Sequence, residues 1–207
     1  MGPKERRERE REETRTMILD AARELFATEG YDAVTMRRIA DRIEYSPTAI
    51  YFHFKDKEAL VRELCDADFL TLAHQFHRIS RIADPLERLR EAGLAYMEFG
   101  LEKPNHYRLM FMTPHAPIKA GDSAIERGNP EVDAYAFLKS IIEDALAQKK
   151  FRKGLTDAEL IAQTVWAGVH GVIALHIAKC SDDWLQWRDV KKRMRAMVDL
   201  LVKGLEK

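Results

Sequence analysis

The stretch TMRRIADRIEYSPTAIYFHF, residues 35–54, contains two short helical patterns separated by a tight turn. Apolar side chains recur at helical spacing over residues 36–43, and Thr35 is suited to cap this first helix. Ser46 and Pro47 then begin a second helix, because proline is favoured at the first helical position. Two short helices joined by such a turn predict a helix-turn-helix, whose second helix lies in the major groove of DNA.

Helical periodicity continues over the rest of the chain, and no convincing strand pattern interrupts it. The pairs Asp84–Pro85 and Asn129–Pro130 predict two further helix starts, because each places a capping side chain before a proline. Thr156 opens a capping-box pattern that predicts another. We therefore expect an all-α fold of about nine helices.

Composition narrows the class of protein. The chain has 207 residues and a formal net charge of zero, so global charge favours neither nucleic acid nor membrane. Its two cysteines provide no disulfide framework, which favours the cytoplasm. The charged N-terminus lacks the apolar segment of a signal peptide. The longest apolar run, residues 165–178, is short for a membrane span and holds two histidines, so we expect a buried helix and no membrane association.

The helical patterns also suggest a domain organisation. We expect a charged N-terminal arm at residues 1–10 and a DNA-binding domain at residues 11–71, with the motif at about residues 34–53. Residues 72–207 are expected to form a helical domain that binds an effector and dimerises.

A longer stretch supports a resemblance to a known family. The string ILDAARELFATEGYDAVTMRRIADRIEYSPTAIYFHFKDKEALV resembles the DNA-binding domain of TetR-family transcriptional regulators. Further on, AYMEFGLEKPNHYRLMFM and VWAGVHGVIALH resemble the Trp-His-Gly type of regulatory domain, through Trp166, His170 and Gly171. This resemblance implies a cytoplasmic homodimeric repressor, with no cofactor and no enzymatic activity, that leaves its operator when a small effector binds.

The resemblance also implies which residues contact operator DNA. They are Thr35, Arg37, Ser46, Pro47, Thr48, Tyr51, Phe52, His53 and Lys57. Among them, Thr35, Tyr51, His53 and Lys57 are implied to bind the phosphate backbone, which carries no sequence information. The candidates for base edges are Arg37, Pro47, Thr48 and Phe52.

Two features depart from that family pattern. The turn has Glu44 where the family usually has glycine, and Thr48 also stands where glycine is frequent. Glutamate adopts a left-handed conformation only at a cost of roughly 1 kcal/mol. In addition, residues 1–60 contain twelve Lys and Arg but thirteen Asp and Glu. Any DNA footprint must therefore come from the local placement of cations.

The second domain is implied to hold an effector pocket and a dimer interface. Apolar walls with a few polar groups suit a small, largely apolar ligand, and the candidate lining residues are Tyr96, Met97, Tyr107, Met110, Phe111, Tyr135, Trp166 and His170. The last two helices are implied to pair with those of a second subunit through Ala167, Gly171, Ala174, Ala178, Met194, Met197, Val198 and Leu201. Each of these residues is also compatible with a plain helical core.

Three alternatives remain open. His74 and His77 have a spacing that metal ligands can adopt, which would suit an enzyme, but no partner set completes a metal site in the sequence. The second alternative is a non-specific architectural DNA binder. The third is a helical sensor that no longer binds DNA. The departures at Glu44 and Thr48 keep the last alternative open.

Overall fold

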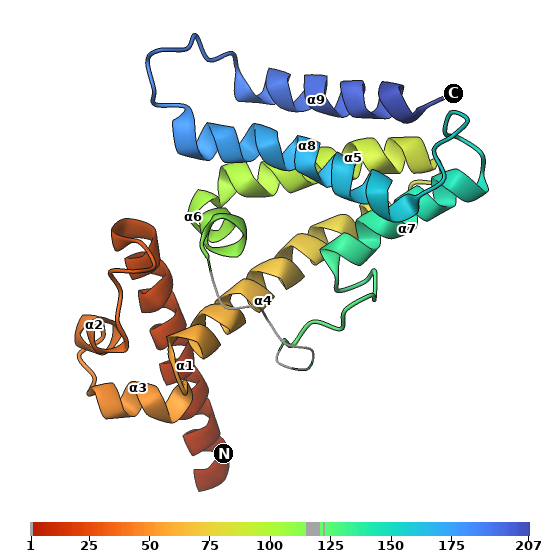
Figure 1. Cartoon of the computed structure of the whole chain (residues 1–207). Helices are drawn as coiled ribbons and strands as arrows, with labels where there is room; N and C mark the ends of the chain where they lie inside the picture. The colour runs from red at the N-terminus through yellow and green to blue at the C-terminus, as the bar shows by residue number, and fades with distance from the viewer. Residues whose placement is uncertain (1, 115–120, 122) are drawn as a thin grey trace. The chain divides into compact units, whose positions relative to one another are not determined.

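The computed structural model describes residues 2–114, 121 and 123–207, and helices are the regular elements of this part of the chain (Figure 1). The helices are α1 (Pro3–Glu29), α2 (Met36–Arg42), α3 (Pro47–His53), α4 (Lys57–Phe76), η1 (Ile79–Arg81), α5 (Pro85–Glu102), α6 (Pro104–Tyr107), η2 (Arg108–Met112), α7 (Ala134–Ala147), α8 (Ala158–Lys179) and α9 (Val190–Leu205). Nine of them are α-helices in the described residues, which confirms the predicted all-α class.

The chain forms two compact units. The first comprises Met1–Asp68 and Asn105–Ala124, and the second comprises Phe69–Pro104 and Ile125–Lys207. The sequence predicts two domains that meet at a single boundary near residue 71. In the structure, the segment that includes α6 and η2 instead belongs to the same unit as the helix-turn-helix. The expected arm at residues 1–10 is helical from Pro3 onward.

Local capping places the helices of the first unit. The Thr35 hydroxyl accepts the backbone N–H of Arg38 at 3.2 Å, and the Ser46 hydroxyl accepts that of Ala49 at 3.2 Å, so both predicted N-caps are confirmed. The core beneath them consists of side chains with no solvent exposure: Ile18, Ala22, Val34, Ile39, Ala40 and Ile50. These contacts hold α1, α2 and α3 together as one small head.

The turn between α2 and α3 contains a non-glycine residue with positive φ. Glu44 has a φ of 59°, which is the left-handed conformation for which glycine is favoured. The following N–H, that of Tyr45, donates to the Ala40 carbonyl at 3.0 Å and closes the turn. The turn is therefore formed at a conformational cost that a glycine would not incur.

In the second unit α5 packs against α7, α8 and α9. Glycines permit the close contacts: a Cβ atom at Gly93 would lie 3.1 Å from Cγ2 of Val198, and one at Gly168 would lie 3.0 Å from Cδ1 of Leu201. Both distances are shorter than ordinary van der Waals contact, so a larger residue would push α9 outward.

Two predicted helix starts are wrong in position. α7 begins at Ala134, not after Asn129, because Asp133 accepts the N–H groups of the first turn at 2.9 and 3.2 Å. The Asn129–Pro130 pair instead makes a preceding turn, in which Asn129 accepts the N–H of Glu131 at 3.0 Å. At α8 the cap is Asp157 rather than Thr156.

α8 has unusual composition for a surface helix. Among the described residues it is the helix long and apolar enough to cross a membrane by length and composition, a test that the core helix of a soluble protein also passes. Here it packs on α5, α7 and α9, with 28% of its most apolar window buried. The helix predicted to be buried is only partly buried within the single chain, since Leu160 and Leu175 on its outer face are exposed.

Candidate nucleic-acid interface

The two faces of α3 differ sharply in exposure. Ile50 is fully buried and Phe54, just after the helix, is 2% exposed, whereas Tyr51 is 54% and Phe52 72% exposed. Pro47 and Thr48 at the start of the helix are also exposed. The helix is thus attached through one face, and the side chains expected to contact DNA lie on the other.

The three arginines of α2 are used differently. Arg38 pairs with Glu29 at 2.6 Å, and Arg42 pairs with Glu24 at 2.8 Å. Arg37 is exposed and forms no ion pair within the described part of the chain. Of the α2 guanidinium groups, that of Arg37 is therefore available to an incoming DNA strand without breaking a contact.

Lys57 is largely engaged inside the head. Its Nζ donates to the carbonyl oxygens of Tyr31 at 3.0 Å and Val34 at 3.1 Å, and lies 4.0 Å from the centre of the Tyr31 ring. An ammonium group has three donors, so one remains. Lys57 braces the connection between α1 and α2, and its contact with a phosphate stays a prediction that rests on this third donor.

His53 ends α3 in an environment that disfavours its charged form. Burial lowers the pKa of His53, and the nearby guanidinium groups of Arg11 and Arg15 lower it further. Its Nδ1 is buried without a hydrogen-bond partner in the described structure. His53 is therefore neutral near pH 7, and a phosphate contact by this residue would be an uncharged hydrogen bond.

Sequence reasoning missed two charged networks in the first unit. Arg15 pairs with Glu63, donates to the His53 carbonyl at 3.0 Å and lies 4.4 Å from the centre of the Phe54 ring. This residue connects α1, α3 and α4. The sequence offers no local signal for such contacts, because the partners are 38 to 48 residues apart.

The second missed network surrounds a buried carboxylate. Asp68 is 4% exposed, and it accepts from Arg23 at 2.6 Å and lies 2.9 Å from Nδ1 of His106. These contacts connect α1, α4 and α6 within the first unit. The sequence gives no distinct sign of this network, because Asp68 lies in a helix that also carries Glu58, Arg62, Glu63 and Asp66.

The residues expected to line an effector pocket fall into both units. In the second unit, Nε1 of Trp166 donates to the Tyr96 hydroxyl at 3.0 Å, and that hydroxyl lies 3.1 Å from Nδ1 of His170. The ring of Tyr135 lies 5.9 Å from that of Trp166, and Met97 is fully buried. Burial lowers the pKa of His170, so its imidazole is neutral.

The other three candidates, Tyr107, Met110 and Phe111, belong to the first unit. Tyr107 is fully buried, and its ring lies 4.9 Å from that of Phe111. The aromatic cluster around Tyr96 is therefore the larger connected part of the expected lining.

Family models match both parts of the chain. Residues 18–64 match the model described as "Bacterial regulatory proteins, tetR family", and residues 89–201, more than half of the chain, match "Tetracyclin repressor-like, C-terminal domain". The chain belongs to the TetR family. The likeness of its second domain to the Trp-His-Gly type stays a prediction.

Relatives within the TetR family are transcriptional regulators. UidR from Escherichia coli K12 is 32% identical over 93 residues, which are 45% of this chain and 42% of UidR, so the match spans less than half of that relative. AcrR from Shigella flexneri is 26% identical over 202 residues, 93% of this chain and 89% of AcrR. In the structure of PfmR from Thermus thermophilus, a TetR-family regulator, 99% of the chain aligns with 92% of this one, with a TM-score of 0.69 and 23% identity. These relatives are described as transcriptional regulators, and the family model that matches residues 18–64 is described as that of bacterial regulatory proteins.

Proposed function

We propose that this TetR-family protein is a homodimeric repressor that leaves its operator when a small, largely apolar effector binds its second unit. The observation that carries the proposal is the division of α3 into a buried face at Ile50 and an exposed face at Tyr51 and Phe52. A helix presented in this way suits insertion into the major groove. Binding to operator DNA would place the protein in the cytoplasm.

The outer faces of α8 and α9 support the proposed dimer. Leu160 and Leu175 on α8 are 62% and 52% exposed, and Leu200 on α9 is 70% exposed. Met194 and Val198 are buried within the single chain, so we leave them out of the interface. Six of the expected residues retain exposed surface: Ala167, Gly171, Ala174, Ala178, Met197 and Leu201.

Small side chains on α8 favour close helix pairing. A Cβ atom at Gly171 would meet no atom within 4 Å in the single chain, so this position leaves room for an approaching helix. Apart from Glu159 and Lys179 near its ends, α8 carries no charged residue. A symmetric dimer through this surface would bury apolar area that is otherwise in water.

The Tyr96 cluster supports an effector with limited polarity. Tyr96, Trp166 and His170 supply a hydroxyl, an indole N–H and a neutral imidazole among aromatic walls. Such a lining suits an aromatic or aliphatic ligand with one hydrogen-bonding group. If this ligand prefers a conformation that does not fit the operator, its binding weakens DNA binding, typically by about 1–3 kcal/mol of coupling.

Reciprocal coupling tests this mechanism. A panel of small aromatic and aliphatic compounds is screened by thermal shift, and the affinity of each hit is measured by calorimetry with and without operator DNA. We expect operator to weaken compound binding by the same factor by which the compound weakens operator binding. Equal compound affinities in the two conditions would remove the proposed mechanism.

A further inference from the structure

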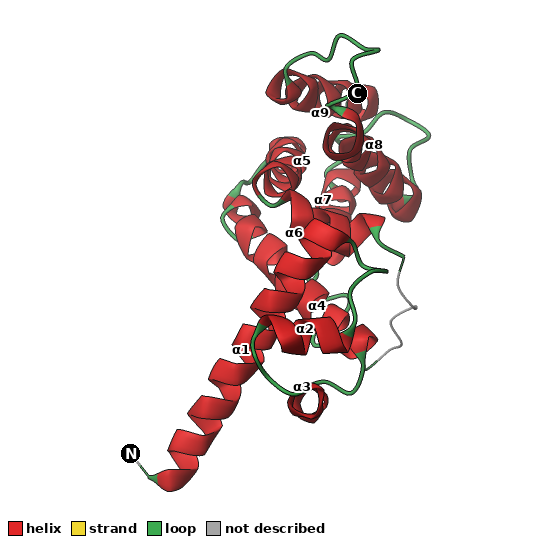
Figure 2. Ribbon diagram, turned by 90° about the vertical axis from the view of Figure 1, so that its left-hand side faces the viewer, coloured by secondary structure: helices red, strands yellow, loops and turns green. Residues whose placement is uncertain are grey.

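The N-terminal half of α1 extends beyond the other two helices of the head, past α3 (Figure 2). This extension is strongly charged yet helical. Arg6 pairs with Glu10 at 2.8 Å and Arg9 pairs with Glu13 at 3.4 Å, both at the i, i+4 spacing that stabilises exposed helices. The Arg6–Glu10 and Arg9–Glu13 pairs lie on one side of α1. Other cations occupy the opposite side of the helix.

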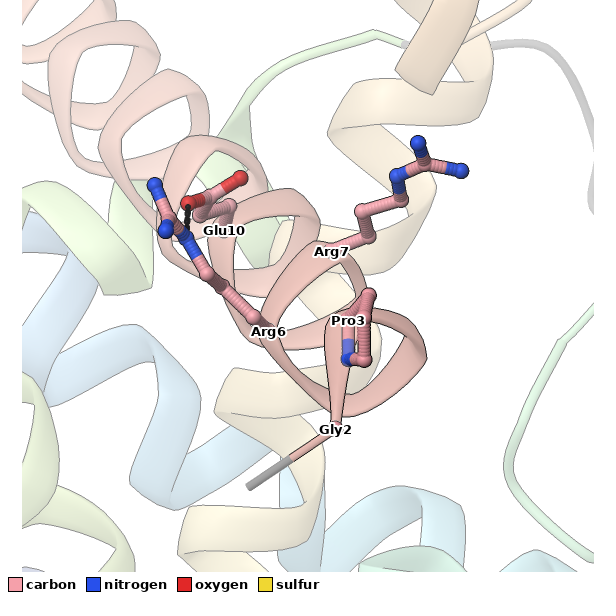
Figure 3. A pocket seen from close by; sticks show the side chains of 5 residues that line it. All are labelled: Gly2, Pro3, Arg6, Arg7 and Glu10. Atoms are coloured by element: carbon pink, nitrogen blue, oxygen red, sulfur yellow. Dashed lines mark hydrogen bonds and ion pairs between the residues drawn. The ribbon is translucent and has the colours of Figure 1, made fainter.

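A cationic stripe occupies one face of this extension. Lys4, Arg7, Arg11 and Arg15 follow one another at spacings of three or four residues, so they lie on one side of the helix. In Figure 3 the Arg7 side chain extends away from the side on which Arg6 and Glu10 pair. Lys4, Arg7 and Arg11 are exposed and form no ion pair within the described part of the chain.

The stripe faces the end of α3. The guanidinium carbon of Arg11 lies 5.5 Å from the centre of the Phe52 ring, and Arg15 donates to the carbonyl of His53 at 3.0 Å. Two successive members of the stripe therefore contact α3 itself. Glu8 lies four residues after Lys4 and three before Arg11, so one carboxylate borders this face, but it forms no ion pair with Lys4, Arg7 or Arg11 in the described residues.

We propose that Lys4, Arg7 and Arg11 bind backbone phosphates of the DNA duplex just outside the base pairs that α3 contacts. The inference rests on the proposed contact of α3 with DNA. Guanidinium groups match phosphate oxygens in geometry and charge. At about 1.5 Å per residue, Lys4 to Arg11 spans about 10 Å along the helix, the length of about three base pairs.

The stripe also accounts for how a head without net positive charge attracts DNA. Residues 1–60 contain one more acidic than basic side chain, so attraction depends on where the cations lie. Arg6 and Arg9 pair with Glu10 and Glu13, and Arg15 pairs with Glu63, whereas Lys4, Arg7 and Arg11 form no ion pair within the described residues. Glu10 and Glu13 are thus engaged in ion pairs on the other side of the helix, whereas Glu8 borders the stripe without an ion pair to it in the described residues.

A charge-matched pair of variants tests the proposal in the full-length protein. Arg7→Gln/Arg11→Gln removes two members of the stripe, and Arg6→Gln/Arg9→Gln removes the same charge from the opposite side. Glutamine is a good helix former, and circular dichroism checks that α1 is kept. Fluorescence anisotropy then measures the affinity for DNA as a function of salt concentration. Two duplexes are compared: an operator recovered from a random pool, and the same operator shortened by about four base pairs at each end. This shortening is slightly more than the length that the stripe would span.

We expect the stripe variant to bind the long duplex at least about tenfold more weakly at moderate salt. The slope of log K against log salt should fall by about 3.6, because the proposed dimer loses two phosphate contacts in each subunit. The control variant should stay within about twofold of the wild type in affinity, with its slope unchanged. Trimming the duplex should weaken the wild type and leave the stripe variant unaffected. Restoring charge with Arg7→Lys/Arg11→Lys should recover most of the slope.

Other outcomes separate this inference from the proposed function. If Tyr51→Ala weakens binding but the stripe variant behaves like its control, the stripe does not contact DNA and the role of α3 stands. If both glutamine variants lower the slope equally, the effect is general charge and the proposal is wrong. If the wild type binds no duplex, the proposed function and this inference both fail.

Discussion

The helices α3 and α8 both expose apolar side chains, but their surroundings differ. Phe52 on α3 has the guanidinium of Arg11 over its ring, and Arg15 bonds to the carbonyl of the next residue. On α8 the exposed Leu160 and Leu175 are accompanied by alanine and glycine. Aromatic side chains among cations suit nucleic acid, whereas small apolar side chains suit another protein surface. An exposed hydrophobic residue therefore indicates the kind of partner only when the chemistry of the surrounding side chains is considered as well.

The largest expected effect comes from comparing alanine substitutions on the buried face of α3, at Ile50, and on its exposed face, at Phe52. Ile50→Ala should lower the free energy of unfolding by about 2–5 kcal/mol, because it leaves a cavity in the core of the head. Phe52→Ala should change stability by less than about 0.5 kcal/mol and still reduce operator affinity. Urea titration and anisotropy check the pair, and equal stability losses would contradict the assignment of faces.

The corresponding comparison on the second unit uses α8 and α9. Leu175→Glu should raise the dimer dissociation constant by about a hundredfold, because dimerisation would then bury an unpaired carboxylate. Val198→Ala, a buried position, should lower stability and leave the protein dimeric. Light scattering over micromolar concentrations measures the mass, and a wild type that is monomeric throughout this range would refute the dimer.

Lys57 tests whether a residue can serve both the head and the DNA. Lys57→Met removes the donor to two carbonyl groups, and we expect a stability loss of about 1–3 kcal/mol. We also expect the salt slope of operator binding to fall by about 1.8, since the third donor would no longer reach a phosphate in either subunit of the dimer. A stability loss with an unchanged slope would leave Lys57 as a brace alone.

The smallest expected effect concerns the turn before α3. Glu44→Gly should stabilise the protein by about 0.5 kcal/mol, since glycine relieves the left-handed strain but loses more backbone entropy on folding. Glu44→Ala keeps the strain and serves as the control. The shift in the urea midpoint measures the difference, and an equal or larger gain from alanine would show that φ is not the cause.

The sequence predicts the head better than it predicts the contacts that hold it. The caps at Thr35 and Ser46 follow from side chains that bond within their own first turn, and both are present. The start of α7 was misplaced because Asn129–Pro130 and Asp133 are both suitable caps, and only the packed structure selects between them. Local sequence thus identifies the possible helix caps, and tertiary contacts determine which of them is used.

Most of what the sequence could not predict involves long-range charge. Asp68 contacts Arg23, which is 45 positions away in the sequence, and His106, which is 38 positions away. No local sequence pattern predicts these contacts. The stripe on α1 was hidden for a different reason, because nearby acidic residues cancel it in any count of charge. Its position beside α3 emerges once the helix is built, because Arg11 then lies over the ring of Phe52.

Selection of bound DNA from a random pool tests the central claim most directly, because it examines the head and the dimer together. The account predicts enrichment of a near-palindromic sequence whose half-site centres are about 34 Å, one helical turn, or a whole multiple of this apart. Recovery of no preferred sequence, or of a single half-site without a symmetric mate, would contradict it.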